Sequence, residues 1–306
     1  MKIFICKLTV FLFVSFAILT IYFVSGAKLA TLAYGVCTQE QIVNSFEYAK
    51  QKHFNKVFLG NSRVYRGINP DIIDKSTYNF AHDNDSYNQC YYKLVYLLNS
   101  GHKIDTLFLG ADYFEFGIKS GTRNYVYDKL FDGNYYKDYN KDIVDEIIAN
   151  GKQVLYNNQL LCVKAFFSIL RPNGAKGILK ENGQYIYDSK ASINDSVKRE
   201  MKVLDFQYDY YLELIKLCHK NNITVIVFTM PVRDSEMSSY TKEYISKIHK
   251  LIVEPLIKDD RYFDLSDVEE FKDYHKYTDI THLNSKAADE FTDYFWKRIN
   301  NKQYGF

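Results

Sequence analysis

The most apolar stretch of the chain lies at its N-terminus. Residues 8–24 carry no charge, and Lys2 and Lys7 precede them. A run of about 20 apolar residues can cross a bilayer as a helix. Because basic residues favour the cytoplasmic side, we expect residues 1–28 to be a single membrane anchor with a cytoplasmic N-terminus and an extracytoplasmic domain after it. A cleaved signal peptide, with small residues at 25–27, is the alternative and exports the same domain.

After residue 28, short apolar runs alternate with segments of helical periodicity. The apolar runs predict buried strands at 56–60, 77–81, 105–111, 223–231 and 261–266. Apolar residues at helical spacing predict helices at 29–53, 87–99, 205–220, 239–257 and 285–299. Strands that alternate with helices indicate a parallel sheet covered on both faces. The sequence therefore predicts an α/β fold, a flavodoxin-like three-layer α/β/α sandwich with a five-stranded parallel sheet.

This alternation stops between residues 117 and 202. The segment is rich in Tyr, Asn, Asp, Lys and Gly, and it holds one apolar helix candidate at 160–170 and a turn at 172–174. We expect residues 29–306 to form one domain, with 117–202 inserted as a cap beside the functional edge of the sheet. A small separate domain is the alternative.

Composition excludes some classes of function. The net charge of +2 gives no bulk attraction to nucleic acid. None of the five cysteines forms a CxxC pair, so zinc ribbons and thioredoxin-like motifs are absent; disulfides and buried free thiols both stay open. The chain has no P-loop or GxGxxG motif. The segment His82-Asp83-Asn84-Asp85 holds residue types that bind metals, but adjacent side chains point in different directions, and we expect neither metal nor cofactor.

Two polar motifs stand where open α/β sheets form their sites, beyond the carboxyl ends of strands. Ser62 directly follows the first predicted strand, and Asp279 precedes His282 by three residues just before the last helix. An Asp at that spacing can orient the imidazole, which can then take a proton from a Ser hydroxyl. The sequence predicts a catalytic triad of Ser62, His282 and Asp279. A turn serine and a helix-capping Asp with a surface His are the alternative.

These two motifs also carry a family resemblance. LGNSR at 59–63 and DITHLN at 279–284 resemble the first and last sequence blocks of SGNH (GDSL-like) hydrolases. GINPDII at 67–73 and FLGADYFEF at 108–116 resemble the membrane-anchored proteins of that group that take part in D-alanyl-lipoteichoic-acid transfer and alginate-type polysaccharide O-acetylation. The resemblance covers most of the domain except 117–202. It implies Ser62 as nucleophile, His282 as general base and acid, and Asp279 as the orienting carboxylate.

The chain departs from the family's oxyanion hole, which combines the nucleophile's N–H, a Gly N–H after the second strand and an Asn side chain after the third. Ala81 lies in a second block without Gly, and Asp112 stands in place of the Asn. An ionised Asp donates no hydrogen bond, and one lost donor costs about 10²–10³ in rate. We therefore expect poor hydrolysis of generic esters. The residues expected around an oxyanion or substrate are Asn61, Arg63, Ala81, Gly110 and Asp112.

The resemblance implies extracytoplasmic transfer of an acetyl or D-alanyl group to or from hydroxyls of a cell-surface polysaccharide or teichoic acid. It also implies a multi-pass membrane O-acyltransferase as partner. Arg63 and Arg66 could bind an anionic polymer or be solvated surface arginines. Two other functions stay open: a surface carbohydrate esterase, and a non-catalytic SGNH-like protein that binds polymer or acts as a scaffold of the acylation machinery.

Overall fold

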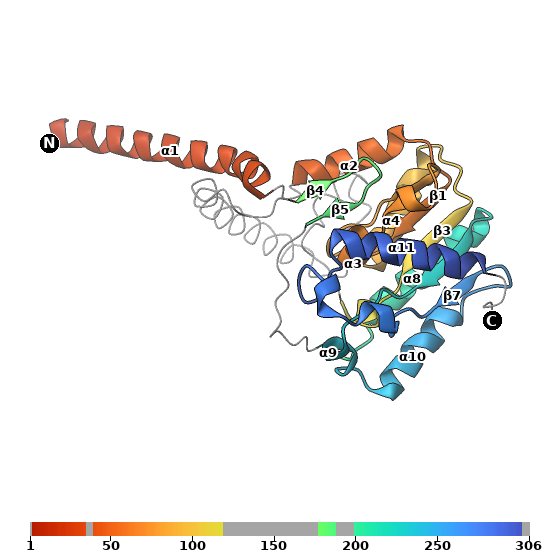
Figure 1. Ribbon diagram of the computed structural model, residues 1–306. Coiled ribbons are helices and arrows are strands. Elements are labelled where there is room, and N and C mark those ends of the chain that lie inside the picture. The colour runs from red at the N-terminus through yellow and green to blue at the C-terminus, as the bar shows by residue number, and fades with distance from the viewer. Residues whose placement is uncertain (1, 35–38, 119–176, 188–198, 302–306) are drawn as a thin grey trace.

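The chain consists of an α/β body and a long N-terminal helix that projects from it (Figure 1). The computed structural model describes residues 2–34, 39–118, 177–187 and 199–301. The projecting helix is α1 (Lys2–Tyr34). Its segment Phe4–Ile21 has a mean hydropathy of 2.4 and no buried residue, so it is long and apolar enough to span a membrane. Which side of a membrane the body would occupy stays a prediction.

A parallel sheet forms the centre of the body. Its strands are β1 (Lys56–Leu59), β2 (Thr77–Asn79), β3 (Thr106–Gly110), β6 (Thr224–Phe228) and β7 (Arg261–Phe263). The five strands are all parallel and lie in the order β2-β1-β3-β6-β7. This is the doubly wound flavodoxin-like order, so the predicted fold class is confirmed. Each strand ends before its predicted limit, because the chain turns away to form the loops of the carboxyl edge.

Successive residues of the strands face opposite layers. Leu59, Leu107 and Leu109 pack into one core, while Phe58 and Phe108 pack into the other. This period of two is the ordinary geometry of a strand, and a sheet that is apolar on both faces must be covered twice.

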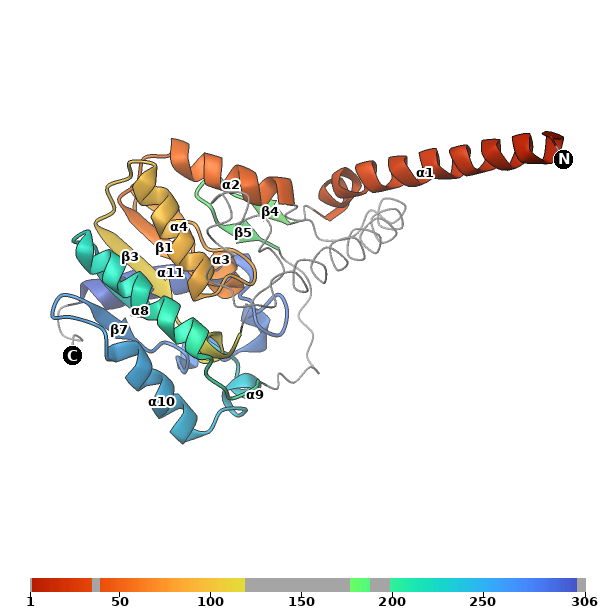
Figure 2. The ribbon, with the colours of Figure 1, turned by 180° about the vertical axis from the view of Figure 1, so that it is seen from behind.

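Helices cover both faces of the sheet. One face carries α2 (Gln39–Gln51), α4 (Tyr87–Asn99), α8 (Asp205–Lys220) and α10 (Lys242–Val253), which lie in front of the sheet in Figure 2. The other face carries α3 (Ser62–Gly67) and α11 (Ser285–Asn300). Predicted helices at 87–99, 205–220 and 285–299 are confirmed to within one residue. Of the helix predicted at 29–53, the described parts are helical, namely the end of α1 and α2, and residues 35–38 between them lie outside the described ranges. The helix predicted at 239–257 is shorter, because Thr241 caps the start of α10.

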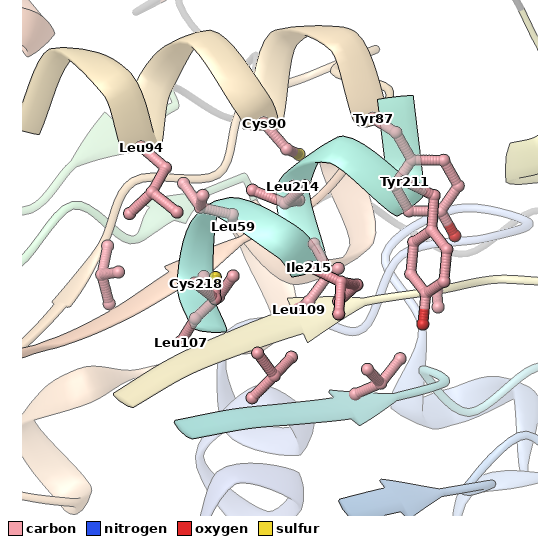
Figure 3. Packing of buried hydrophobic residues seen from close by; sticks show 14 of the residues in the cluster. Leu59, Tyr87, Cys90, Leu94, Leu107, Leu109, Tyr211, Leu214, Ile215 and Cys218 are labelled. Carbon is pink, nitrogen blue, oxygen red and sulfur yellow. The ribbon is translucent and has the colours of Figure 1, made fainter. Parts of the chain in front are cut away.

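Two cysteines lie inside the first of these cores. Cys90 on α4 and Cys218 on α8 are buried free thiols among the leucines above the sheet (Figure 3). Burial raises the pKa of both thiols, so they stay protonated and act as small apolar residues. Cys37 and Cys162 lie outside the described residues.

Part of the expected cap is a short hairpin. The strands β4 (Ile178–Leu179) and β5 (Tyr185–Ile186) pair antiparallel, and Gly183 between them has a φ of +89°. The Asn79 N–H donates to the Asn182 carbonyl at 3.0 Å, so the hairpin lies against the end of β2. A Cβ on Gly183 would come within 1.8 Å of the Asn79 carbonyl oxygen. The helix expected at 160–170 and the turn at 172–174 lie outside the described residues.

Two glycines let α3 approach the sheet closely. Gly60 directly follows β1 and has a φ of +150°, and Gly110 is the last residue of the neighbouring β3. A Cβ on Gly110 would lie 2.4 Å from Cγ2 of Val64, and one on Gly60 would lie 2.7 Å from the same atom. Val64 is fully buried, and its β-branched side chain has little freedom to move aside. The glycines therefore fix the position of the helix that carries Ser62.

We expect Gly110→Ala to lower the free energy of unfolding by about 1–3 kcal/mol, the usual cost of an overpacked core. Gly67→Ala is the matched control, because its new methyl group would clash only with the flexible end of Met230 and would make an ordinary contact with Leu283. Its loss should be smaller. Urea unfolding of the full chain in detergent, followed by fluorescence of the single tryptophan, Trp296, measures both. An equal or larger loss in Gly67→Ala would show that Val64 accommodates the methyl group.

Candidate active site

Ser62, His282 and Asp279 lie together at the carboxyl edge of the sheet. His282 Nε2 lies 2.8 Å from Ser62 Oγ, and His282 Nδ1 lies 2.7 Å from Asp279 Oδ2. The tautomer follows from the partners: Nδ1–H donates to the carboxylate, and Nε2 accepts from the serine hydroxyl. The structure thus brings the three predicted residues into one hydrogen-bonded chain, with the geometry of a nucleophile, a base and an orienting acid.

Local hydrogen bonds shape the loop that holds the acid and the base. Asp279 Oδ1 accepts from the backbone N–H groups of Thr281 and His282, each at 2.9 Å. The N–H of Thr278 donates to the His282 carbonyl at 2.9 Å, which closes the loop. Asn284 then caps α11 by accepting from the N–H of Ala287. The imidazole is therefore aimed at Ser62 by backbone geometry that the DITHLN sequence encodes locally.

The helix of the nucleophile is joined to the helix that follows the base. The Asn69 N–H donates to Thr292 Oγ1 at 2.9 Å, and Asn69 Nδ2 donates to Asp289 Oδ1 at 2.7 Å. Asn69 follows α3, whereas Thr292 and Asp289 belong to α11. These bonds fix the position of Ser62 relative to His282, which lies more than 200 residues later in the sequence.

The electrostatic environment favours an ionised acid and a neutral base. Burial opposes ionisation of Asp279, but the hydrogen bonds from His282 and from the loop outweigh it and hold the pKa of this carboxyl well below its usual range. Burial lowers the pKa of His282, the bond to Asp279 opposes that change, and the Arg66 guanidinium lowers it further. The imidazole is thus poised to accept a proton near neutral pH.

Asn61 and Asp112 form part of the scaffold beneath Ser62. Asn61 caps α3 by accepting from the Arg63 N–H at 2.9 Å, and its Nδ2 donates to Asp112 Oδ2 at 2.9 Å and to Glu115 Oε2 at 3.1 Å. Asp112 Oδ1 accepts from the Met230 N–H at 3.1 Å. Both side chains are buried and already hydrogen-bonded. The prediction that they surround a substrate is therefore corrected: they position the nucleophile's helix.

Arg63 is also a structural residue. It is 3 % exposed, forms a close ion pair with Glu236, and lies 3.7 Å from Asp112. Its guanidinium also lies over the ring of Phe114, 4.8 Å from the centroid. Burial alone would lower the pKa of Arg63. The two carboxylates outweigh burial and raise this pKa above its usual value, so the group stays charged. Arg63 is therefore neither solvated nor available to an anionic polymer, contrary to both expectations.

The oxyanion donors expected from the family differ here. The Ala81 N–H donates to Asn79 Oδ1 at 3.1 Å, so it is already bonded. The Val64 side chain of α3 occupies the space beside the Gly110 Cα, so Gly110 makes room for α3. The N–H of Ser62, at the first position of α3, has no acceptor within its own helix. Of the three expected positions, it is the one that keeps a donor for an oxyanion.

Sequence reasoning missed three acidic partners near the site: Asp83, Glu115 and Glu236. Glu236 lies 173 residues from Arg63 along the chain, and no local pattern joins the two. Glu115 stands three residues after Asp112, a spacing that could have indicated a shared turn. Burial, and then the charge of Asp112, raises the pKa of Glu115 well above its usual range. The Asn61 amide donates to both Asp112 and Glu115, so it bridges the two carboxyl groups under α3.

A cavity of about 550 Å³ lies beside the triad, between α2, the end of β2 and the β4–β5 hairpin. Its lining combines aromatic rings with amide and charged side chains, and it includes Ala81 and His82 from the loop after β2, which also carries Asp83, the partner of Arg66. The ring of His82 stacks on Tyr65, 4.6 Å between centroids. Ser62, Asp279 and His282 do not line the cavity.

In the described parts of the chain, no group of three or more His, Cys, Asp or Glu side chains could hold a metal ion.

Comparisons with known proteins do not assign this chain to a family. No family model matches it, and no curated protein matches it. A solved chain described as "a putative platelet activating factor from Streptococcus pneumonia" matches with a TM-score of 0.37 and 13 % identity, over 84 % of this chain and 92 % of that one. A likeness this distant supports no statement about activity. The SGNH resemblance therefore stays an expectation from the sequence blocks, and the argument for function depends on the geometry.

We expect Arg63→Met to lower the free energy of unfolding by about 3–5 kcal/mol, because it removes the buried cation shared by Glu236 and Asp112 and leaves Glu236 with only the partly exposed Arg199. The matched control is Lys297→Met, which removes an exposed pair with Asp293 and should cost less than about 1 kcal/mol. Urea unfolding of the full chain compares the two. Equal losses would contradict a structural role for Arg63.

Proposed function

We propose that this chain is a serine-dependent acyltransferase, with Ser62 as nucleophile, His282 as general base and acid, and Asp279 as the orienting carboxylate. The observation that carries the proposal is the continuous hydrogen-bonded chain from Ser62 Oγ through both ring nitrogens of His282 to Asp279. A capping Asp with a surface His would not aim its imidazole at a serine on a distant helix. The ionised acid and neutral base match the first proton transfer that the reaction needs.

In the first half-reaction, Ser62 Oγ attacks the carbonyl carbon of an acyl donor while its proton passes to His282 Nε2. The Ser62 N–H is the donor at hand for the oxyanion that forms. When this intermediate collapses, the bond to the leaving group breaks, and His282 returns the proton to the leaving oxygen or sulfur. The acyl group remains as an ester on Ser62, and Asp279 stabilises the imidazolium between the two transfers.

In the second half-reaction, a hydroxyl of the acceptor loses its proton to His282 and attacks the ester carbon. The Ser62–acyl bond breaks, and His282 returns the proton to Ser62 Oγ. The product is an ester of the acceptor. If water takes the place of the hydroxyl, the same steps give hydrolysis. This is the activity of the alternative, a surface carbohydrate esterase.

The proposed substrate and setting follow from the sequence blocks and the anchor. The acyl group is acetyl or D-alanyl, and the acceptor is a hydroxyl of a cell-surface polysaccharide or teichoic acid. The apolar helix α1 supports attachment to a membrane. We place the α/β body outside the cytoplasm, where a multi-pass membrane O-acyltransferase would supply the acyl group.

A non-catalytic role in binding or scaffolding is a second candidate, favoured by one observation. The Ala81 N–H is bonded to Asn79, and Asp112 carries no donor and is held by Asn61 and Met230. Two of the family's three oxyanion donors are thus missing. Each lost donor costs about 10²–10³ in rate, which would leave a weak enzyme or none for generic esters.

Covalent labelling by a fluorophosphonate separates these candidates. We expect the full chain to be labelled at Ser62, with no labelling in Ser62→Ala and a rate lower by about 10²–10⁴ in His282→Ala. His275→Ala is the matched control, since this exposed histidine lies in the same loop region and should leave the rate unchanged. Mass spectrometry locates the adduct. A wild-type chain that reacts no faster than Ser62→Ala would support the non-catalytic role.

The labelling rate should depend on pH through the base. Below the pKa of His282 the imidazole is protonated and cannot accept the Ser62 proton, so the rate should rise with pH and level off above that pKa. Because burial and Arg66 lower this pKa, we expect the midpoint below the ordinary value of about 6.5. Samples stopped at intervals across pH 4–9 measure it, a range of ~2.5 units on each side of that value. A midpoint above 7 would contradict the proposed environment.

A further inference from the structure

We propose that Arg66, held in place by Asp83, is a positioning residue of this site. Its guanidinium lies between the carboxylates of Asp83 and Asp279 and presents a positive charge to the imidazole, so that Asp279 stays turned toward His282 and His282 is neutral when Ser62 must lose its proton. The inference rests on the proposed function of Ser62, and it assigns Arg66 a role other than binding an anionic polymer.

The helix α3 brings Arg66 to the triad. Arg66 follows Ser62 by four residues, so both side chains lie on the same face of this helix. Arg66 Nη1 lies 3.7 Å from Asp279 Oδ2 and 3.4 Å from His282 Nδ1. The guanidinium therefore approaches the triad from the acid's side, opposite to the Nε2 atom that faces Ser62.

Asp83 fixes the other side of the guanidinium. Arg66 Nη2 donates to both oxygens of Asp83 at 3.1 Å, and Nε donates to Oδ1 at 3.3 Å. The ring of Tyr185 on the hairpin lies 5.6 Å from the guanidinium carbon, and Gln184 Nε2 donates to the Arg66 carbonyl at 3.1 Å. A fork bonded in this way has little rotational freedom, so its charge is held at a defined distance from the imidazole.

The result is a chain of alternating groups: Asp83, Arg66, Asp279, His282 and Ser62. The charged groups that face the imidazole are Asp279 from its own loop, Arg66 from α3 and Asp83 from the loop after β2. Arg66 is the single cation among them, and it opposes protonation of His282. The two carboxylates act in the opposite direction, so removing Arg66 leaves the imidazole facing only negative charge.

The same arrangement argues against Arg66 as a ligand of an anionic substrate. Its guanidinium already contacts Asp83 and Asp279, and the three groups together carry a net charge of −1. An incoming phosphate or carboxylate would have to displace one carboxylate and approach the other. Arg66 acts on the chemistry through its neighbours.

The test measures the protonation of His282 directly. In the full chain in detergent with ¹³C-labelled histidine, the ring signal of His282 is assigned by its loss in His282→Gln and then titrated by NMR. We expect Arg66→Gln to raise the midpoint by about one pH unit. Arg66→Lys, which keeps the charge, should stay closer to the wild type. Arg261→Gln is the matched control, because Arg261 bonds the Ile299 carbonyl away from the site and should cause no shift.

The fluorophosphonate labelling profile supplies the second readout. Its midpoint should move upward in Arg66→Gln by the same amount as the NMR midpoint. Arg66→Met, which keeps the aliphatic stem beside Tyr185, must shift both in the same direction and serves if Arg66→Gln does not fold. An unchanged or lower NMR midpoint in these variants would overturn the inference. If the midpoint rises while wild-type Ser62 is not labelled, the role of Arg66 stands and the proposed acyl transfer falls.

Discussion

The hydrogen bond from Asn61 to Asp112 joins the ends of the two central strands directly beneath Ser62. Most of the site depends on it. Asn61 uses its oxygen to begin α3 and its nitrogen to bind Asp112, so one side chain sets both the start of the helix and its position on the sheet. Around this bond, the Arg63 guanidinium lies between the buried carboxylates of Asp112 and Glu236 and offsets part of their negative charge. The nucleophile is therefore presented by a network that is itself closed to solvent.

This network limits the chemistry as well as supporting it. An amide at position 112 could offer an N–H to an oxyanion, whereas the carboxylate of Asp112 accepts from Asn61 and from the Met230 N–H. Position 112 could have stabilised a transition state, but here its side chain stabilises α3 instead. Such an exchange suits a slow reaction on a donor held in place by a partner, and it suits poorly the hydrolysis of small esters that diffuse in freely.

Much of this arrangement could be predicted from local sequence. The five-stranded parallel sheet follows from apolar runs that alternate with helical segments, and Ser62, Asp279 and His282 stand out because each lies near a strand or helix boundary. The roles of Arg63 and Asp112 could not be predicted. Arg63 resembles a surface arginine near a helix start until Glu236, far along the chain, is seen to cover it. A buried ion pair between distant segments produces no periodic pattern in the sequence. The sequence therefore suggested that Arg63 and Asp112 contact a ligand, whereas the protein uses them to pack α3.

The length of α1 has a consequence for where the site can work. A helix of 33 residues is about 50 Å long, whereas the hydrocarbon core of a bilayer is about 30 Å thick. If the apolar segment Phe4–Ile21 occupies the core, the remainder of α1 continues beyond it as a stalk. The α/β body would then be joined to the bilayer through a helical segment outside the hydrocarbon core, which separates the site from its anchor.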